Sequence, residues 1–188
     1  MENKSAMISQ LSIKNGFLIA LIIVAISLML HFIDPLMMYT SSLAGMATFV
    51  VFIVLLVVIG QSIRKAVGGY WTFGDAFKSF LIMSLIITSV STLYNVVLMG
   101  VIDPGLPAKA GAVIEESQRE MMGKLGLSED EIDEALEKSG SMEDRLAITF
   151  KNVITSFGVV LAIYGVISLI LAAILKKNPP VYLGGAEE

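Results

Sequence analysis

The sequence predicts an all-α, polytopic membrane protein with four transmembrane helices and a helical hairpin inserted between the third and the fourth. Three observations predict this fold class. Apolar residues make up 55% of the 188 residues and charged residues only 16%, against about 25% charged residues in typical soluble domains. Four apolar stretches are long enough to cross a hydrocarbon core of about 30 Å. The one long connection between them is acidic and carries helix-capping signals.

The first predicted span covers about residues 16–33. It holds no ionisable residue before its last turn, where His31 lies, and Asp34-Pro35 then supplies a helix stop. A cleaved signal peptide is the alternative interpretation, because two lysines precede the stretch. No small-residue cleavage site follows it, so we expect a retained transmembrane helix.

The other three spans are predicted from their length and hydropathy. The second, about residues 42–62, contains an uninterrupted apolar run from Phe49 to Ile59. The third and the fourth, about residues 76–102 and 149–175, exceed the minimum length and can therefore tilt. We expect residues 1–188 to form a single membrane domain with four spans.

The basic residues near the ends of these spans predict the orientation, because short cytoplasmic loops carry an excess of lysine and arginine. The N-terminal segment, the loop after the second span and the end of the fourth span are basic, whereas the connection over residues 34–41 holds no lysine or arginine. We therefore expect both termini to be cytoplasmic. The basic residues concerned are Lys4, Lys14, Arg64, Lys65, Lys78, Lys176 and Lys177.

Residues 103–148 form the predicted extracytoplasmic loop between the third and fourth spans. Between residues 103 and 144 the loop carries twelve acidic side chains and four basic ones. Ser128 and Glu131 have the spacing of a capping box, and Gly126 is expected to end a preceding helix. A structureless loop of this length is uncommon. We therefore expect an acidic helical hairpin.

One polar face occurs within the spans. Its residues recur in the third span at offsets of four, seven, eight and eleven, which places them on one side of a helix. Packing against the fourth span is one interpretation, because Gly158-x-x-x-Ala162 and Ser168-x-x-x-Ala172 offer small residues there. The lining of a substrate path is the alternative. The residues of this face are Ser84, Thr88, Ser91, Thr92 and Asn95.

The loop before the third span supplies a second candidate element. Its aromatic residues suit the membrane interface, where rings anchor helices, and its glycines permit backbone geometries closed to other residues. We interpret it as a cytoplasmic turn that leads into the third span. A regulatory or partner-binding element is the alternative. Its residues are Gly68, Gly69, Tyr70, Trp71, Phe73 and Gly74.

The residue types that are missing also limit the function. The chain contains no cysteine and one histidine, so we expect no metal site and no cysteine nucleophile. The middles of the spans hold no ionisable residue, which argues against a proton-coupled pump. No nucleophile–base set is recognisable. We predict no catalytic, cofactor-binding or metal-binding residue, no cofactor, no enzymatic activity and no binding of nucleic acid.

Five segments have an order and spacing that are also found together in a known family. They are Gly68–Lys78, Leu93–Asn95, Ile102–Pro104, Leu127–Leu136 and Leu175–Pro179. The most specific is Gly-Gly-Tyr-x-x-Phe-Gly-x-Ala-Phe-Lys in the first of them. By these segments the chain resembles a bacterial family of small four-span membrane proteins, catalogued as domain of unknown function 4199. The resemblance implies the four-span architecture and a bacterial cytoplasmic (inner) membrane, but neither an activity nor catalytic residues.

Two hypotheses of function follow. The first is a non-enzymatic integral membrane protein that acts through membrane lipids and through a protein partner at the external hairpin. The second is a small transporter or channel that uses the polar face of the third span. A homo-oligomer is compatible with either. An intramembrane enzyme is the least favoured class, because no catalytic set is present.

Overall fold

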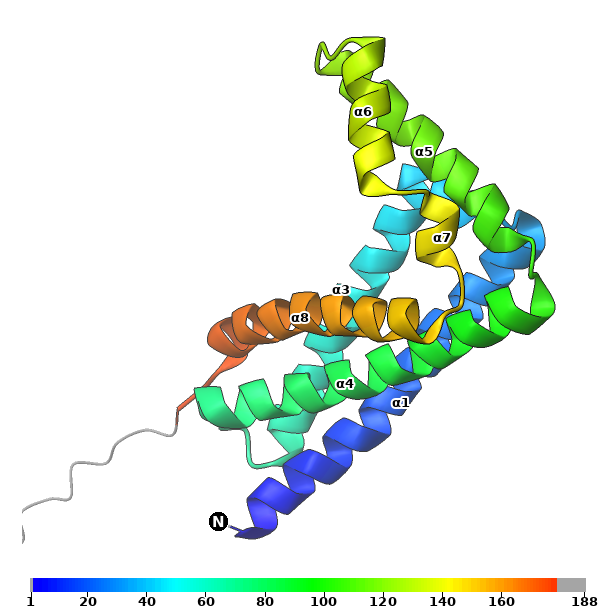
Figure 1. Cartoon of the computed structure of the whole chain (residues 1–188). Coiled ribbons are helices and arrows are strands. Elements are labelled where there is room, and N and C mark those ends of the chain that lie inside the picture. Colours follow the sequence, from blue (N-terminus) through cyan, green and yellow to red (C-terminus); the bar gives the residue numbers. More distant parts are fainter. Residues whose placement is uncertain (1, 179–188) are drawn as a thin grey trace, which may run out of the picture.

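Four long helices form the body of the protein in a computed structural model that describes residues 2–178 (Figure 1). Each of the four is long and apolar enough to cross a membrane. The described part of the chain is otherwise made of shorter helices and turns. The structure thus confirms the predicted all-α fold with four spans. The long helices are α1 (Glu2–Ile33), α3 (Ser42–Ala66), α4 (Phe73–Val97) and α8 (Phe150–Leu175).

Helix α1 begins at Glu2, well before the apolar stretch that predicted the first span. The added turns are ordered by packing against α4. Ile8 and Ser12 are both fully buried, and the Ser12 hydroxyl lies 2.7 Å from the Ser79 hydroxyl of α4. A hydropathy pattern cannot detect this extension, because it depends on a polar contact with a distant segment.

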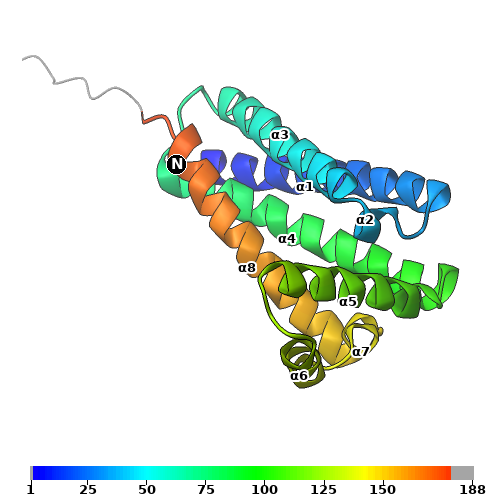
Figure 2. The same cartoon turned by 90° about the horizontal axis from the view of Figure 1, so that it is seen from above.

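Helices α1 and α4 run parallel and pack along one another (Figures 1 and 2). The backbones approach closely at Gly16, where an added Cβ would lie 3.2 Å from the Met83 Cα and the Ile86 Cβ. Small residues at such positions let helices associate inside membranes, where the hydrophobic effect does not drive them together. Gly16 therefore fixes the spacing of this helix pair.

Helix α8 runs antiparallel to α4 and contacts it in the half of the bundle near its own C-terminal end. Ser168 and Ala172 are buried in this contact. The other small-residue pattern, at Gly158 and Ala162, is exposed, and an added Cβ at Gly158 would touch nothing within 4 Å. The prediction that this second pattern faces the third span is therefore wrong, because α8 diverges from α4 over that part of its length.

The predicted hairpin is present between α4 and α8. Helix α4 continues into a π-helical turn, η1, and three helices then rise from this end of the bundle (Figure 1). Gly126 adopts a φ of +89° where α5 ends, and the capping box of Ser128 and Glu131 begins α6. A third helix, α7, was not predicted. The elements are η1 (Leu98–Ile102), α5 (Leu106–Lys124), α6 (Glu129–Ser139) and α7 (Met142–Leu146).

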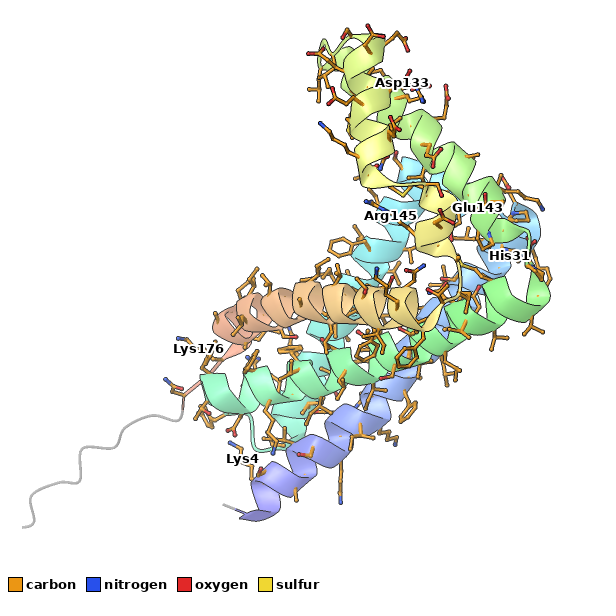
Figure 3. The ribbon with its side chains drawn as sticks, viewed as in Figure 1. Lys4, His31, Asp133, Glu143, Arg145 and Lys176 are labelled. Carbon is orange, nitrogen blue, oxygen red and sulfur yellow. The ribbon has the colours of Figure 1, made fainter. Side chains whose placement is uncertain are left out.

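The two ends of the bundle differ in charge. We call one the basic end: it holds the start of α1, the end of α3, the start of α4 and the end of α8. Lys4 and Lys176 both lie there (Figure 3). We call the opposite one the hairpin end, and it also contains the short helix α2 (Met37–Thr40). The alternation of the four long helices between these two ends is what four successive membrane crossings require.

Most of the large apolar side chains point away from the bundle. In the most apolar window of each span, only 17% to 22% of the residues are buried inside the protein. Leu43 and Phe32, for example, are each 77% exposed. Apolar surfaces of this extent are not stable in water. Acyl chains must therefore cover the outside of the bundle.

We predict that the protein stays in the membrane pellet when vesicles are extracted with alkaline carbonate. The reason is that only acyl chains can solvate the apolar surface on the outside of the bundle. Immunoblotting of pellet and supernatant measures the partition, with a peripheral membrane protein as the control that is released. Release of this chain into the supernatant would contradict the four-span assignment.

Candidate functional site

The polar face predicted on the third span divides into two parts in α4. Ser84 lies in the part nearer the basic end and is buried, with its hydroxyl 3.1 Å from the Ser168 hydroxyl of α8. It packs between two helices. The other four residues lie toward the hairpin end and line a cavity. These four are Thr88, Ser91, Thr92 and Asn95.

This α4–α8 cavity has a volume of about 240 Å³ and lies where α4 and α8 diverge. The end of α7 and the segment that joins it to α8 roof the cavity, through Arg145 and residues 146–148. Helix α8 contributes two polar residues, Asn152 and Ser156, beside two valines. Sequence reasoning missed these side chains. Their spacing of four residues, which places both on one face of a mostly apolar helix, is the signal that could have found them.

One hydroxyl in the cavity wall has no hydrogen-bond partner among the described residues. It belongs to Thr88, whose side chain is only 1% exposed. Other hydroxyls in the spans bond the carbonyl four residues earlier, as Ser12 does to Ile8 at 2.7 Å and Ser89 to Leu85 at 2.8 Å. An unsatisfied buried hydroxyl costs about 1–3 kcal/mol. The wall of the cavity therefore contains one buried hydroxyl whose hydrogen-bonding capacity is not used by the described residues.

Helix α5 positions the roof. An added Cβ at Gly111 would lie 2.7 Å from the backbone nitrogen of Glu143, so α7 rests directly on the α5 backbone. The Glu115 carboxylate accepts a hydrogen bond of 2.7 Å from the Met142 amide at the start of α7. On the other side, the Asn152 amide of α8 donates to the Ala147 carbonyl at 3.0 Å. The hairpin and the cavity are thus parts of one structural unit.

A second cavity, of about 370 Å³, is lined by α1, α2 and α3 as well as by α4 and α8. Ser91 and Asn95 line both cavities, as does Tyr39 of α2. Burial raises the pKa of Tyr39, and the nearby Tyr94 raises it further. Tyr39 is therefore a neutral hydrogen-bonding group. The hairpin half of the bundle is loosely packed and lined with neutral polar groups.

The half of the bundle near the basic end is filled instead by apolar side chains. Phe80, Met83 and Leu56 are almost completely buried there. Helix α3 comes so close to α4 at Gly60 that an added Cβ would lie 2.6 Å from the Phe80 ring. None of the buried residues of this apolar core lines either cavity, although Ile23 and Tyr164, which pack against the core, line the second one.

The candidate loop element lies at the basic end and has a structural role. Trp71 is fully buried, and its indole N–H donates to the Leu175 carbonyl at 2.9 Å. Its backbone also exchanges two hydrogen bonds of 3.0 Å with Lys177. The expectation that Trp71 anchors in the lipid interface is therefore wrong. It is drawn inward because the last turn of α8 leaves carbonyl groups that need donors.

The rest of this loop element shapes the turn around Trp71. Gly68 and Gly69 have φ values of +100° and +81°, a left-handed region that favours glycine. Phe73 begins α4, with Gly74 in its first turn. Tyr70 and Phe73 are both partly exposed, and the Lys177 ammonium lies 5.4 Å from the Tyr70 ring centroid.

Two more contacts complete what we call the basic-end clamp, which consists of Lys4, Arg64, Trp71, Asp75 and the Leu175 carbonyl. The Arg64 guanidinium also donates to that carbonyl at 3.0 Å. The Lys4 ammonium lies 3.1 Å from the Asp75 carboxylate. The clamp therefore joins the ends of all four long helices.

We predict that Trp71→Ala lowers the free energy of unfolding in detergent by about 3–5 kcal/mol, because it leaves a cavity in the clamp. Trp71→Phe should cost less, because it keeps the ring and loses one hydrogen bond worth about 1 kcal/mol. Thermal unfolding measures both. Tyr70→Phe is the control and should match the wild type. Unchanged stability of Trp71→Ala would show that the clamp does not hold the helices.

We predict that Gly111→Ala displaces α7, because the new methyl group meets the α7 backbone, at a cost of about 1–3 kcal/mol. Trypsin should then cleave after Arg145 faster, on the order of tenfold. Gly123→Ala on the same helix is the matched control, since its Cβ would touch nothing within 4 Å. Equal cleavage rates for the two variants would contradict the packing described for α7.

Comparison with known proteins shows which family the chain belongs to. The model of one family, described as "Protein of unknown function (DUF4199)", matches residues 14–177. No curated protein and no solved structure matches the chain. The matched range runs from within α1 to the Lys177 that pairs with Trp71, and so includes both cavities and the hairpin. The chain belongs to the DUF4199 family.

Proposed function

We propose that this protein is a non-enzymatic, multi-pass protein of the bacterial cytoplasmic membrane, which acts by binding partners at its hairpin end. The positive-inside rule places the basic end in the cytoplasm, together with both termini, and the hairpin outside. The bacterial membrane follows from the family resemblance. The partner-binding role is supported by one observation above all, the rigid and acidic hairpin on the outer end of the bundle.

The hairpin is built as a fixed surface. Ile132 of α6 is buried, and the Arg119 guanidinium of α5 lies 2.7 Å from the Asp133 carboxylate of α6. Hydrogen bonds from the amide and hydroxyl of Ser128 lower the pKa of Glu131, so this cap stays charged at neutral pH. A linker between two spans needs none of these features. Their presence favours recognition of a partner.

The charge of this surface indicates what kind of partner fits. Helix α6 exposes Glu129, Asp130 and Glu137, and none of them has an ion pair in the part of the chain that the structure describes. Acidic patches attract basic ones and speed their encounter. A protein segment rich in lysine or arginine on the outer side of the membrane is the partner that this chemistry recognises.

We predict that a photo-crosslinking residue at Asp130 captures a discrete partner in living cells. Neutralising the surface with Glu129→Gln and Glu137→Gln should abolish the adduct, because the attraction is electrostatic. The matched control is Glu116→Gln with Glu120→Gln on α5, which removes the same charge from the neighbouring helix. Adducts that persist equally in both pairs, or none in the wild type, would contradict a role of α6 in binding.

A transporter or channel is the second candidate, and the polar lining of the α4–α8 cavity is the observation that favours it. Thr88 and Asn95 both line that cavity. A complete path would also require the Phe80 and Trp71 side chains at the basic end to move, since both are fully buried.

Solute flux into proteoliposomes tests this second candidate. A flux that disappears with Asn95→Leu, but not with Ser89→Leu on the exposed side of the same helix, would support transport. The absence of flux for neutral, anionic and cationic solutes alike would count against it.

A further inference from the structure

The α4–α8 cavity does not end inside the bundle. A hollow of about 490 Å³ continues from it along α8. Arg145, Asn152, Ser156 and Val160 belong to both. The outer wall of the hollow includes Val159, which is 54% exposed on the apolar surface of the bundle. The cavity therefore opens sideways, toward the acyl chains, as well as beneath its roof.

The depth of this opening matches one leaflet of a bilayer. Helix α8 begins at Phe150, at the hairpin end. From Asn152 to Val160 the helix rises about 12 Å, and half of a hydrocarbon core is about 15 Å thick. The hollow therefore extends from the membrane surface to near the bilayer middle, as a phospholipid of that leaflet does.

The polarity of the walls is graded along the same direction. Arg145, in the last turn of α7, lies at the mouth of the cavity, above the start of α8 (Figure 3). Its guanidinium donates a hydrogen bond to the Ser139 carbonyl. It has no carboxylate within 4.0 Å among the described residues, although acidic residues dominate the hairpin. Deeper in the cavity, Asn95, Ser91 and Thr88 present neutral hydrogen-bonding groups. Two valines, Val159 and Val160, line the lateral hollow together with Thr155 and Ser156.

We propose that this cavity binds one phospholipid from the leaflet at the hairpin end, which is the outer leaflet in the proposed orientation. The planar guanidinium of Arg145 is suited to a phosphate group. Asn95 and Ser91 hydrogen-bond the rest of the headgroup, and Thr88 reaches it through a water molecule. One acyl chain leaves through the lateral opening and lies along Val159.

This inference deepens the proposed function, because it makes a lipid one of the partners at the hairpin end. It rests on the membrane placement of the bundle and does not require the acidic surface of α6. Because α7 is held by α5 and also roofs the cavity, a bound lipid would hold the roof, and with it the base of the hairpin, in place.

The test is native mass spectrometry of the full chain after reconstitution with phosphatidylglycerol and gentle extraction. The wild type should retain one lipid molecule. Arg145→Gln should lower its occupancy about tenfold, since it removes a charge-assisted hydrogen bond. Arg119→Gln is the matched control, an arginine of the same hairpin that lies outside the cavity, and should retain the lipid. An equal loss of bound lipid in both variants would show that the lipid is held by the overall charge of the hairpin and not by the cavity, and would overturn the proposal.

A second variant keeps the proposal testable if Arg145→Gln fails to fold. Val159→Trp changes only a bilayer-facing side chain and should block the lateral opening, so lipid retention falls while thermal stability stays at the wild-type value. Retention that neither Val159→Trp nor Arg145→Gln changes would place the lipid elsewhere and overturn the proposal.

Competition with a large excess of inorganic phosphate tests whether the site binds a phospholipid or a free phosphate ion. We expect no displacement, because the acyl chain contributes to binding. Complete displacement would show an anion site without lipid selectivity and would overturn the proposal. Crosslinking at Asp130 is read separately: lost lipid with intact crosslinks overturns this inference alone, whereas lost crosslinks with retained lipid overturn the protein-partner role alone.

Discussion

Every backbone polar group that lies in hydrocarbon must find its hydrogen-bond partner inside the protein. Within the four long helices this requirement is met by the helices themselves, but at a helix end it has to be met by something else. The Leu175 carbonyl near the end of α8 accepts from both the Trp71 indole and the Arg64 guanidinium. The basic-end clamp is thus a consequence of where α8 stops, and it brings the loop before α4 under that helix end.

The clamp accounts for the difference between the two halves of the bundle. In the half of the bundle near the basic end, close approaches at Gly16 and Gly60 leave room only for apolar side chains and small paired hydroxyls such as Ser12 with Ser79. At the hairpin end, α8 diverges from α4, and the polar lining from Thr88 to Asn95 faces a cavity instead of packing tightly against α8. Helix α7 covers the space that results. One end therefore holds the helices together, and the other is free to bind.

The spans could be predicted from sequence because insertion into a bilayer depends on the apolar length of each segment and hardly on its neighbours. The capping box at Ser128 and the turn at Gly126 could also be predicted, because each depends only on residues close by in the sequence. The burial of Trp71, the early start of α1 and the exposure of Gly158 were not, because each is decided by a segment far away in the sequence. Only one wall of the cavity could be predicted. The α4 wall follows from helical periodicity, whereas Asn152 and Ser156 of α8 come to face that wall only after the chain has folded.

The division of the bundle into a closed half and an open half can be measured directly, because the chain contains no natural cysteine. Ser84→Cys and Ser91→Cys place a thiol two turns apart on the same face of α4. A membrane-impermeant thiol reagent would be added to intact spheroplasts, and modification would be followed by mass shift. We predict that the cysteine at position 91 is modified from outside and that the one at position 84 is not. Equal modification of both would contradict the division into an open half at the hairpin end and a closed half at the basic end, and modification of position 91 only from the cytoplasmic side would contradict the proposed orientation.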